Sequence, residues 1–105
     1  MYAAALRLEI RIPNAHSLKE KRRVVKGLCA LLAANFPVAV SEVGFQDQWQ
    51  RATLGVAMVA PQAGQLERLM LAVERAVREH PDVELLETGA AYLEERGAAA
   101  LTSGR

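Results

Sequence analysis

A strict alternation near the N-terminus constrains the fold of this chain more than any other feature. Leu6, Leu8, Ile10 and Ile12 alternate with Arg7, Glu9 and Arg11. This period of two is typical of a strand with one apolar face and one charged face. Such a strand needs a partner layer over its apolar face only. The pattern therefore predicts a sheet that is covered on one side, with its first strand over residues 6–12 and a break at Pro13-Asn14.

Five further elements follow along the chain. We expect a helix over 17–35, a strand over 38–45, a strand over 50–60, a helix over 65–79 and a strand over 83–93. The phase of the second strand is irregular, which a bulge or a two-sided edge strand would explain. The last strand is expected to kink at Gly89, with a short helix over 90–96 as the competing interpretation.

This order of elements predicts the fold class. Strand, helix, strand, strand, helix, strand is the order of a ferredoxin-like α+β domain, βαββαβ, with an antiparallel sheet and two helices on one face. The first and third strands are then central in the sheet. At 105 residues the chain fits one such domain over 1–96, and the small and polar residues 97–105 are expected to form a frayed tail.

The composition of the chain indicates the compartment in which the protein is expected. The chain has one cysteine, Cys29, on the apolar side of the first predicted helix, so no disulfide can form within it. A buried structural thiol in a reducing compartment is the expected state. No apolar run approaches the roughly 20 residues that span a bilayer, and the N-terminus does not read as a signal peptide. We expect a cytoplasmic protein without a membrane partner.

The start of the first predicted helix carries an unusual set of charges. Ser17 and Glu20 form a capping box, in which each side chain reaches the other residue's amide. Acidic residues normally follow such a start, because the first-turn amides carry partial positive charge. Here the following cations are Lys19, Lys21, Arg22, Arg23 and Lys26. Free amides and clustered cations together suit an anion such as phosphate, although a solvated basic face is the plainer interpretation.

One of these cations has a different environment. Lys21 falls in the middle of the apolar side of the helix, so it must extend to solvent or meet a carboxylate. Glu42, at the approach to the hairpin over 46–49, is the best-placed carboxylate. The plainer interpretation of Glu42 is an ordinary charge on an edge strand.

The predicted topology brings several segments to one end of the sheet. The end of the first strand, the start of the first helix, the 46–49 hairpin and the start of the last strand meet there. We expect the anion- or RNA-binding residues at this end to be Ser17, Lys19, Lys21, Arg22, Arg23, Lys26, Arg11, Trp49 and Arg51. For Trp49, a hydrophobic lid on the hairpin is favoured over a platform that stacks bases.

Three segments carry a resemblance to a known family. The stretch SLKEKRRVV at 17–25, the stretch FPVAVSEVG at 36–44 and the stretch QDQWQRA at 46–52 resemble the YlxP-like family of small bacterial proteins, a domain of unknown function. The resemblance covers the chain up to about Val59. It implies a ferredoxin-like fold and a bacterial cytoplasmic protein, and through the genes that often surround the family it points toward RNA or the ribosome. It supplies no activity and no catalytic residues.

Two functional hypotheses follow from these features. The first is a non-catalytic module that binds RNA or a ribosomal surface through the basic helix start. The second is a homodimer that assembles through the open sheet face, where Gly55, Ala57 and Val59 make a flat surface and charges could pair across a two-fold axis. We do not expect an enzyme, a cofactor or a metal site, since the sequence has no clustered metal ligands, no glycine-rich phosphate loop and no nucleophile beside an obvious base.

Overall fold

The computed structural model describes residues 1–95. Its elements are β1 (Tyr2–Arg11), α1 (Leu18–Asn35), β2 (Ala39–Gly44), β3 (Arg51–Ala60), α2 (Ala63–Arg78) and β4 (Glu84–Glu94). The predicted order βαββαβ is confirmed. The frayed tail that the sequence predicts over 97–105 lies outside the described residues.

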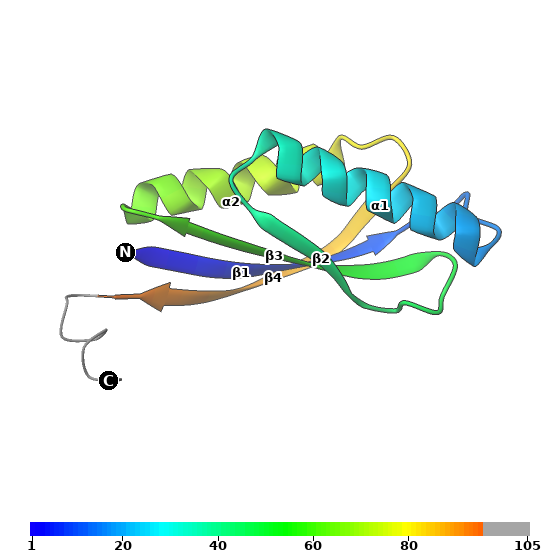
Figure 1. The fold of residues 1–105 in the computed structure, drawn as a ribbon, viewed down its shortest axis with the longest axis horizontal. Helices are drawn as coiled ribbons and strands as arrows, with labels where there is room; N and C mark the ends of the chain where they lie inside the picture. Colours follow the sequence, from blue (N-terminus) through cyan, green and yellow to red (C-terminus); the bar gives the residue numbers. More distant parts are fainter. Residues whose placement is uncertain (96–105) are drawn as a thin grey trace.

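The four strands form one sheet in the order β2-β3-β1-β4, and every neighbouring pair is antiparallel. The central strands β1 and β3 pair in unbroken register from Tyr2↔Ala60 to Arg11↔Arg51. Both helices lie over the same face of the sheet, and the other face is open (Figure 1). The fold is therefore the ferredoxin-like α+β fold that the sequence predicts.

The core lies between the sheet and the two helices. The inward residues of β1 and β3 are buried, Leu8 and Leu54 completely, and they pack with the apolar stripes of both helices. Burial of one large aliphatic side chain stabilises the fold by about 1.5–3 kcal/mol. The helix residues buried in this core are Val25, Leu28, Leu32, Leu66, Met70, Val73 and Val77.

The start of α1 is capped nearly as predicted. The Ser17 hydroxyl accepts a hydrogen bond from the Glu20 amide at 3.1 Å. The Glu20 carboxylate, however, accepts from the amide of His16 at 2.6 Å rather than from that of Ser17. The Glu20 carboxylate therefore binds the amide one residue before the predicted one. This hydrogen bond holds the loop before the helix in addition to the cap.

The last strand confirms the predicted strand over 83–93 but departs from the prediction at Gly89. The residues up to Glu94 are strand, and not the competing short helix, because they pair with the N-terminal half of β1, where Tyr2 lies opposite Glu94. Gly89 is not a kink, since it pairs in register with Arg7. The irregularity falls instead where the register shifts between Glu9 and Ile10. The irregular phase predicted for the second strand coincides with a register shift in β2 between Glu42 and Gly44, so the bulge is one of the two suggested explanations that the structure shows.

Candidate functional site

The segments that the sequence places at one end of the sheet do meet there. The amide of Ile12 donates to the carbonyl of Gln50 at 2.9 Å, and the Gln50 side chain donates to the carbonyls of Pro13 and Ala15. These bonds tie the start of β3 to the loop that leads into α1. The loop between β2 and β3, residues 45–50, is thereby held beside the helix start.

Lys21 connects α1 to this loop from inside the protein. Its side chain is fully buried, and its ammonium donates to the carbonyl of Phe45 at 2.8 Å and to that of Gln46 at 3.4 Å. The same ammonium lies 2.5 Å from a carboxylate oxygen of Glu42, which confirms the predicted pair. A buried charge needs such partners. The Lys21 ammonium therefore binds the loop carbonyls and Glu42, and it is not exposed to solvent.

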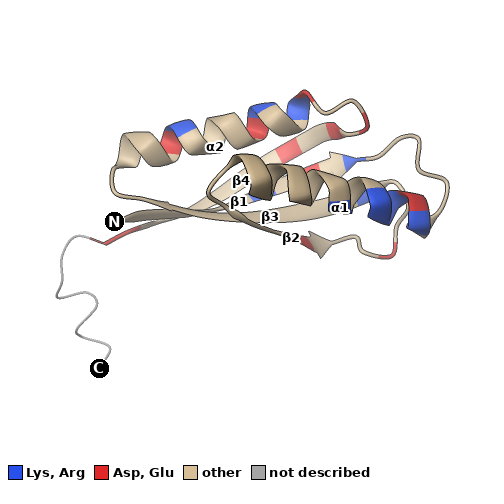
Figure 2. Ribbon diagram, turned by 45° about the horizontal axis from the view of Figure 1, so that its top comes forward, with Lys and Arg blue, Asp and Glu red and all other residues tan. Residues whose placement is uncertain are grey.

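The other four cations of the helix start are exposed. Lys19, Arg22, Arg23 and Lys26 project from the first turns of α1, and we call these four residues the α1 basic face. Figure 2 shows them as a concentrated group at one end of the helix, whereas basic and acidic residues are interleaved along α2. None of the four forms an ion pair within the described part of the chain.

The amides at the start of α1 are partly occupied from within. The Ser17 hydroxyl accepts a hydrogen bond from the amide of Glu20, and the Glu20 carboxylate lies in the first turn. A carboxylate there offsets the partial positive charge of the helix end. The attraction for an external anion therefore rests on the side chains of the α1 basic face more than on the helix amides.

Arg11 and Arg51 lie at the same end as the α1 basic face but on the opposite face of the sheet. Arg11 follows the inward-facing Ile10 and pairs with Arg51 across the strands, so both arginines project from the open face of the sheet. The guanidinium of Arg51 stacks over the Phe45 ring, 4.7 Å from its centroid. Trp49, in the loop, is 53% exposed. The sheet thus separates the arginine pair from the α1 basic face.

A groove of about 550 Å³ runs between α1 and β2. Arg22, Lys26 and Cys29 line its helix side, and Glu42 and Asp47 line its strand and loop side. The Cys29 thiol is half-buried, and burial, aided by the negative charge of Glu42, raises its pKa. A thiol in this state stays protonated near neutral pH and is a weak nucleophile, as the sequence predicts for a structural cysteine.

The charges in the middle of the open face are paired within the chain. Arg7 forms an ion pair with Glu9 at 2.9 Å, and the Thr53 hydroxyl donates to the other carboxylate oxygen of Glu9. The Arg7 guanidinium also lies over Gly89, where a Cβ would come within 2.7 Å of it. These residues therefore do not need a second molecule to satisfy their charges.

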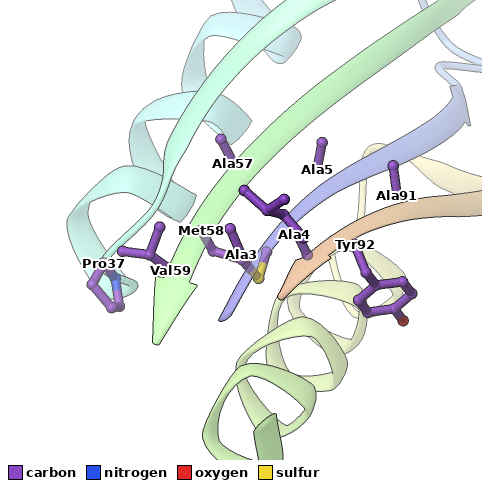
Figure 3. Close-up of a pocket in the computed structure, with 10 residues that line it drawn as sticks. Ala3, Ala4, Ala5, Pro37, Ala57, Met58, Val59, Ala91 and Tyr92 are labelled. Atoms are coloured by element: carbon purple, nitrogen blue, oxygen red, sulfur yellow. The ribbon is translucent and has the colours of Figure 1, made fainter. Parts of the chain in front are cut away.

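A shallow apolar hollow of about 440 Å³ occupies the far end of the open face, and the flat surface predicted at Gly55, Ala57 and Val59 covers only part of it. Figure 3 shows small side chains from neighbouring strands, among them Ala5, Ala57 and Ala91, beside the larger Val59. The runs Ala3-Ala4-Ala5 and Ala90-Ala91 are the sequence signal for it, but they join only through the pairing of β1 with β4.

Among residues 1–95, no group of three or more His, Cys, Asp or Glu side chains is placed to hold a metal ion. No helix in this part of the chain is long and apolar enough to cross a bilayer.

Comparison with known proteins places the chain in a family. Residues 3–89 match the model of the family described as "Protein of unknown function (DUF503)". The chain is similar to the protein named "Uncharacterized protein YlxP" of Bacillus subtilis (strain 168), with 38% identity over 73 residues, which cover 70% of this chain and 79% of that relative. Both findings agree with the resemblance that the three sequence segments carry. The chain therefore belongs to the DUF503 family, the family of YlxP-like proteins, whose function is unknown.

Proposed function

We propose that this protein is a non-catalytic binding module in the cytoplasm, and that the α1 basic face contacts the phosphate backbone of structured RNA, free or in the ribosome. The observation that carries the proposal is the concentration of four exposed cations, without ion-pair partners among residues 1–95, in the first turns of one helix. The chain as a whole has a formal net charge of only +1. The positive charge is therefore localised, which favours contact at this surface over general adhesion to polyanions.

The chemistry of these side chains suits backbone contact rather than base reading. Arginine and lysine on an exposed helix face bind phosphates and release condensed counterions, so affinity falls steeply with salt. The buried Lys21 supports this surface indirectly, because it fixes the 45–50 loop and with it the exposed Trp49 beside the helix start. Shape and charge recognition of a folded RNA is the mode that this arrangement supports.

Filter binding of a structured RNA across a salt series tests the proposal. Replacement of all four α1 basic-face residues by alanine should weaken retention at low salt and reduce the slope of log K against log salt by about 3–4, at about 0.9 per lost phosphate contact. The matched control is the Arg68→Ala, Arg75→Ala variant, which removes exposed cations from α2. Absence of retention by the wild type at low salt, or equal losses in both variants, would refute the proposal.

A second candidate function is self-association through the open sheet face. The apolar hollow favours it, because Val59 and Leu93 at its rim are 63% and 61% exposed. Exposed apolar surface of this kind often marks an interface between proteins. A two-fold axis through the hollow would place it against its own copy. Since Arg7 and Glu9 already pair within the chain, the contact would be driven by apolar burial and not by the cross-chain charge pairing that the sequence analysis considered.

Sedimentation velocity distinguishes this candidate. A dimer at tens of micromolar protein (roughly a micromolar dissociation constant) should dissociate when Leu93 is replaced by aspartate. It should persist in the matched Leu71→Asp variant, because Leu71 is a similarly exposed leucine on α2. A wild type that sediments as a monomer in this range would rule out the candidate without affecting the RNA proposal.

A further inference from the structure

Two arginines face each other at the loop end of the open sheet face. Arg11 of β1 and Arg51 of β3 are direct cross-strand partners, so their Cβ atoms lie within about 4.5–5.5 Å of each other. Like charges in this position destabilise a strand pair. We propose that Arg11 and Arg51 form a clamp for a phosphate group, and specifically for a phosphate monoester.

The carboxylates nearest to the two arginines in the sheet are those of Glu9 and Glu84. Glu9, the nearest acidic residue along β1, is engaged by Arg7 and by Thr53. Glu84 of β4 is the cross-strand partner of Arg11 on its other side, and it is the competing carboxylate. Within residues 1–95, neither Arg11 nor Arg51 has a carboxylate oxygen within ion-pair distance. The two guanidinium groups are therefore available to an external anion.

Arg51 is held in a defined orientation. Its guanidinium lies over the Phe45 ring at 4.7 Å, and its Nε is buried without a hydrogen-bond partner. Phe45 itself has a left-handed backbone (φ 56°), and its carbonyl is held by the buried Lys21. A stacked guanidinium loses less freedom when it binds, since its plane is already fixed. With Nε shielded, the terminal nitrogens are the donors left for an oxyanion.

The charge and shape of the pair favour a phosphate monoester. Two guanidinium groups carry two positive charges, and a monoester carries close to two negative charges at pH 7 with three acceptor oxygens. Arginine donors bind such oxygens in parallel pairs, which adds geometric specificity to the attraction. A backbone phosphodiester has one negative charge and would leave one of the two positive charges uncompensated. The inferred ligand is thus a terminal or free phosphate rather than an internal one.

The clamp is independent of the α1 basic face, because the sheet lies between them. Thermal unfolding with added inorganic phosphate, against sodium chloride at matched ionic strength, tests it. Phosphate should raise the midpoint of the wild type and of Arg7→Ala, the control that removes a paired arginine from the same face. Phosphate should not raise the unfolding midpoint of Arg11→Ala or Arg51→Ala. The affinity for phosphate should fall by about 10- to 100-fold in either variant.

Two further comparisons sharpen the test. Arg51→Lys keeps the charge but loses the planar fork, so it should bind phosphate nearly as weakly as Arg51→Ala. In phosphate-free buffer Arg11→Ala should be at least as stable as the wild type, because the like-charge contact is relieved. A phosphate response in the variants equal to that of the wild type, or no response beyond sodium chloride in the wild type, would overturn the inference.

Binding measurements with two oligonucleotides identify the source of the phosphate. Tighter binding of an RNA with a 5′-phosphate than of the same RNA with a 5′-hydroxyl, lost in Arg51→Ala, would assign the clamp to RNA ends. Equal binding of both RNAs, with the phosphate response intact, would assign it to a free phosphate monoester. The variant without the α1 basic face should keep the phosphate response in either case, so failure of the RNA proposal and failure of the clamp are distinguishable.

Discussion

Replacement of Lys21 by methionine should destabilise the protein by about 2–4 kcal/mol. Methionine matches the length of the lysine stem but removes the donor to two carbonyls and to Glu42. A hydrogen bond from a charged group contributes about 1.5–3 kcal/mol, and breaking one side of a buried ion pair costs about 3–5 kcal/mol. Glu42 keeps 19% side-chain exposure, so water recovers part of this loss, and the desolvation cost of the ammonium disappears.

Urea unfolding followed by circular dichroism measures this change, and Trp49 fluorescence reports on the loop separately. Lys19→Met is the matched control, because it makes the same chemical change on the exposed side of the same helix. It should stay within about 0.5 kcal/mol of the wild type. Glu42→Gln should cost less than Lys21→Met, since the ammonium keeps both carbonyls. A Lys21→Met loss below about 1 kcal/mol, or an equal loss in Lys19→Met, would refute the role assigned to the buried network.

Two further predictions concern glycines and the thiol. A Cβ at Gly27 would meet nothing within 4 Å, so Gly27→Ala should raise the free energy of unfolding by about 0.5–1 kcal/mol. A Cβ at Gly44 would lie 2.9 Å from the Thr53 hydroxyl, so Gly44→Ala should lower the free energy of unfolding by about 1–3 kcal/mol. Thermal unfolding of both variants shows whether each substitution stabilises or destabilises the protein. The raised pKa of Cys29 predicts alkylation with a higher pH midpoint in the folded chain than in urea. Since the unfolded thiol ionises first, the protein should lose stability as the pH rises beyond about 8.5, and a Cys29→Ala variant should not show this loss.

Local patterns made much of this fold predictable. The alternation around Leu8 fixes which face of β1 is buried, and Ser17 with Glu20 marks the helix start within a residue. The pairing of Lys21 with Glu42 was one of two outcomes that the sequence allowed, because a lysine among apolar residues must extend to solvent or meet a carboxylate, and the topology makes Glu42 the best-placed one. These inferences need only periodicity and the order of the elements.

Features that depend on register between distant strands were not predictable. The prediction of a kink at Gly89 was wrong, because the sequence does not show that Arg7 lies across it and occupies the space of a side chain. The apolar hollow likewise forms only when Ala3 and Ala5 of β1 meet Leu93 and Ala91 of β4. Such contacts are set by strand alignment, and a shift of one residue would turn every side chain to the other face.

The separation of the cations onto two faces has a consequence for binding. Arg11 and Lys19 are only eight residues apart. Side chains alternate between the two faces along β1, which places Arg11 on the open face, whereas the chain crosses to the helix side of the sheet before Lys19. A ligand on the α1 basic face would have to wrap around the end of the sheet to reach Arg11 and Arg51. Inorganic phosphate at matched ionic strength should therefore leave RNA bound to the α1 basic face in place. Displacement of the RNA by phosphate, abolished in Arg51→Ala, would instead show that one wrapped ligand uses both faces and that the sheet does not divide the surface.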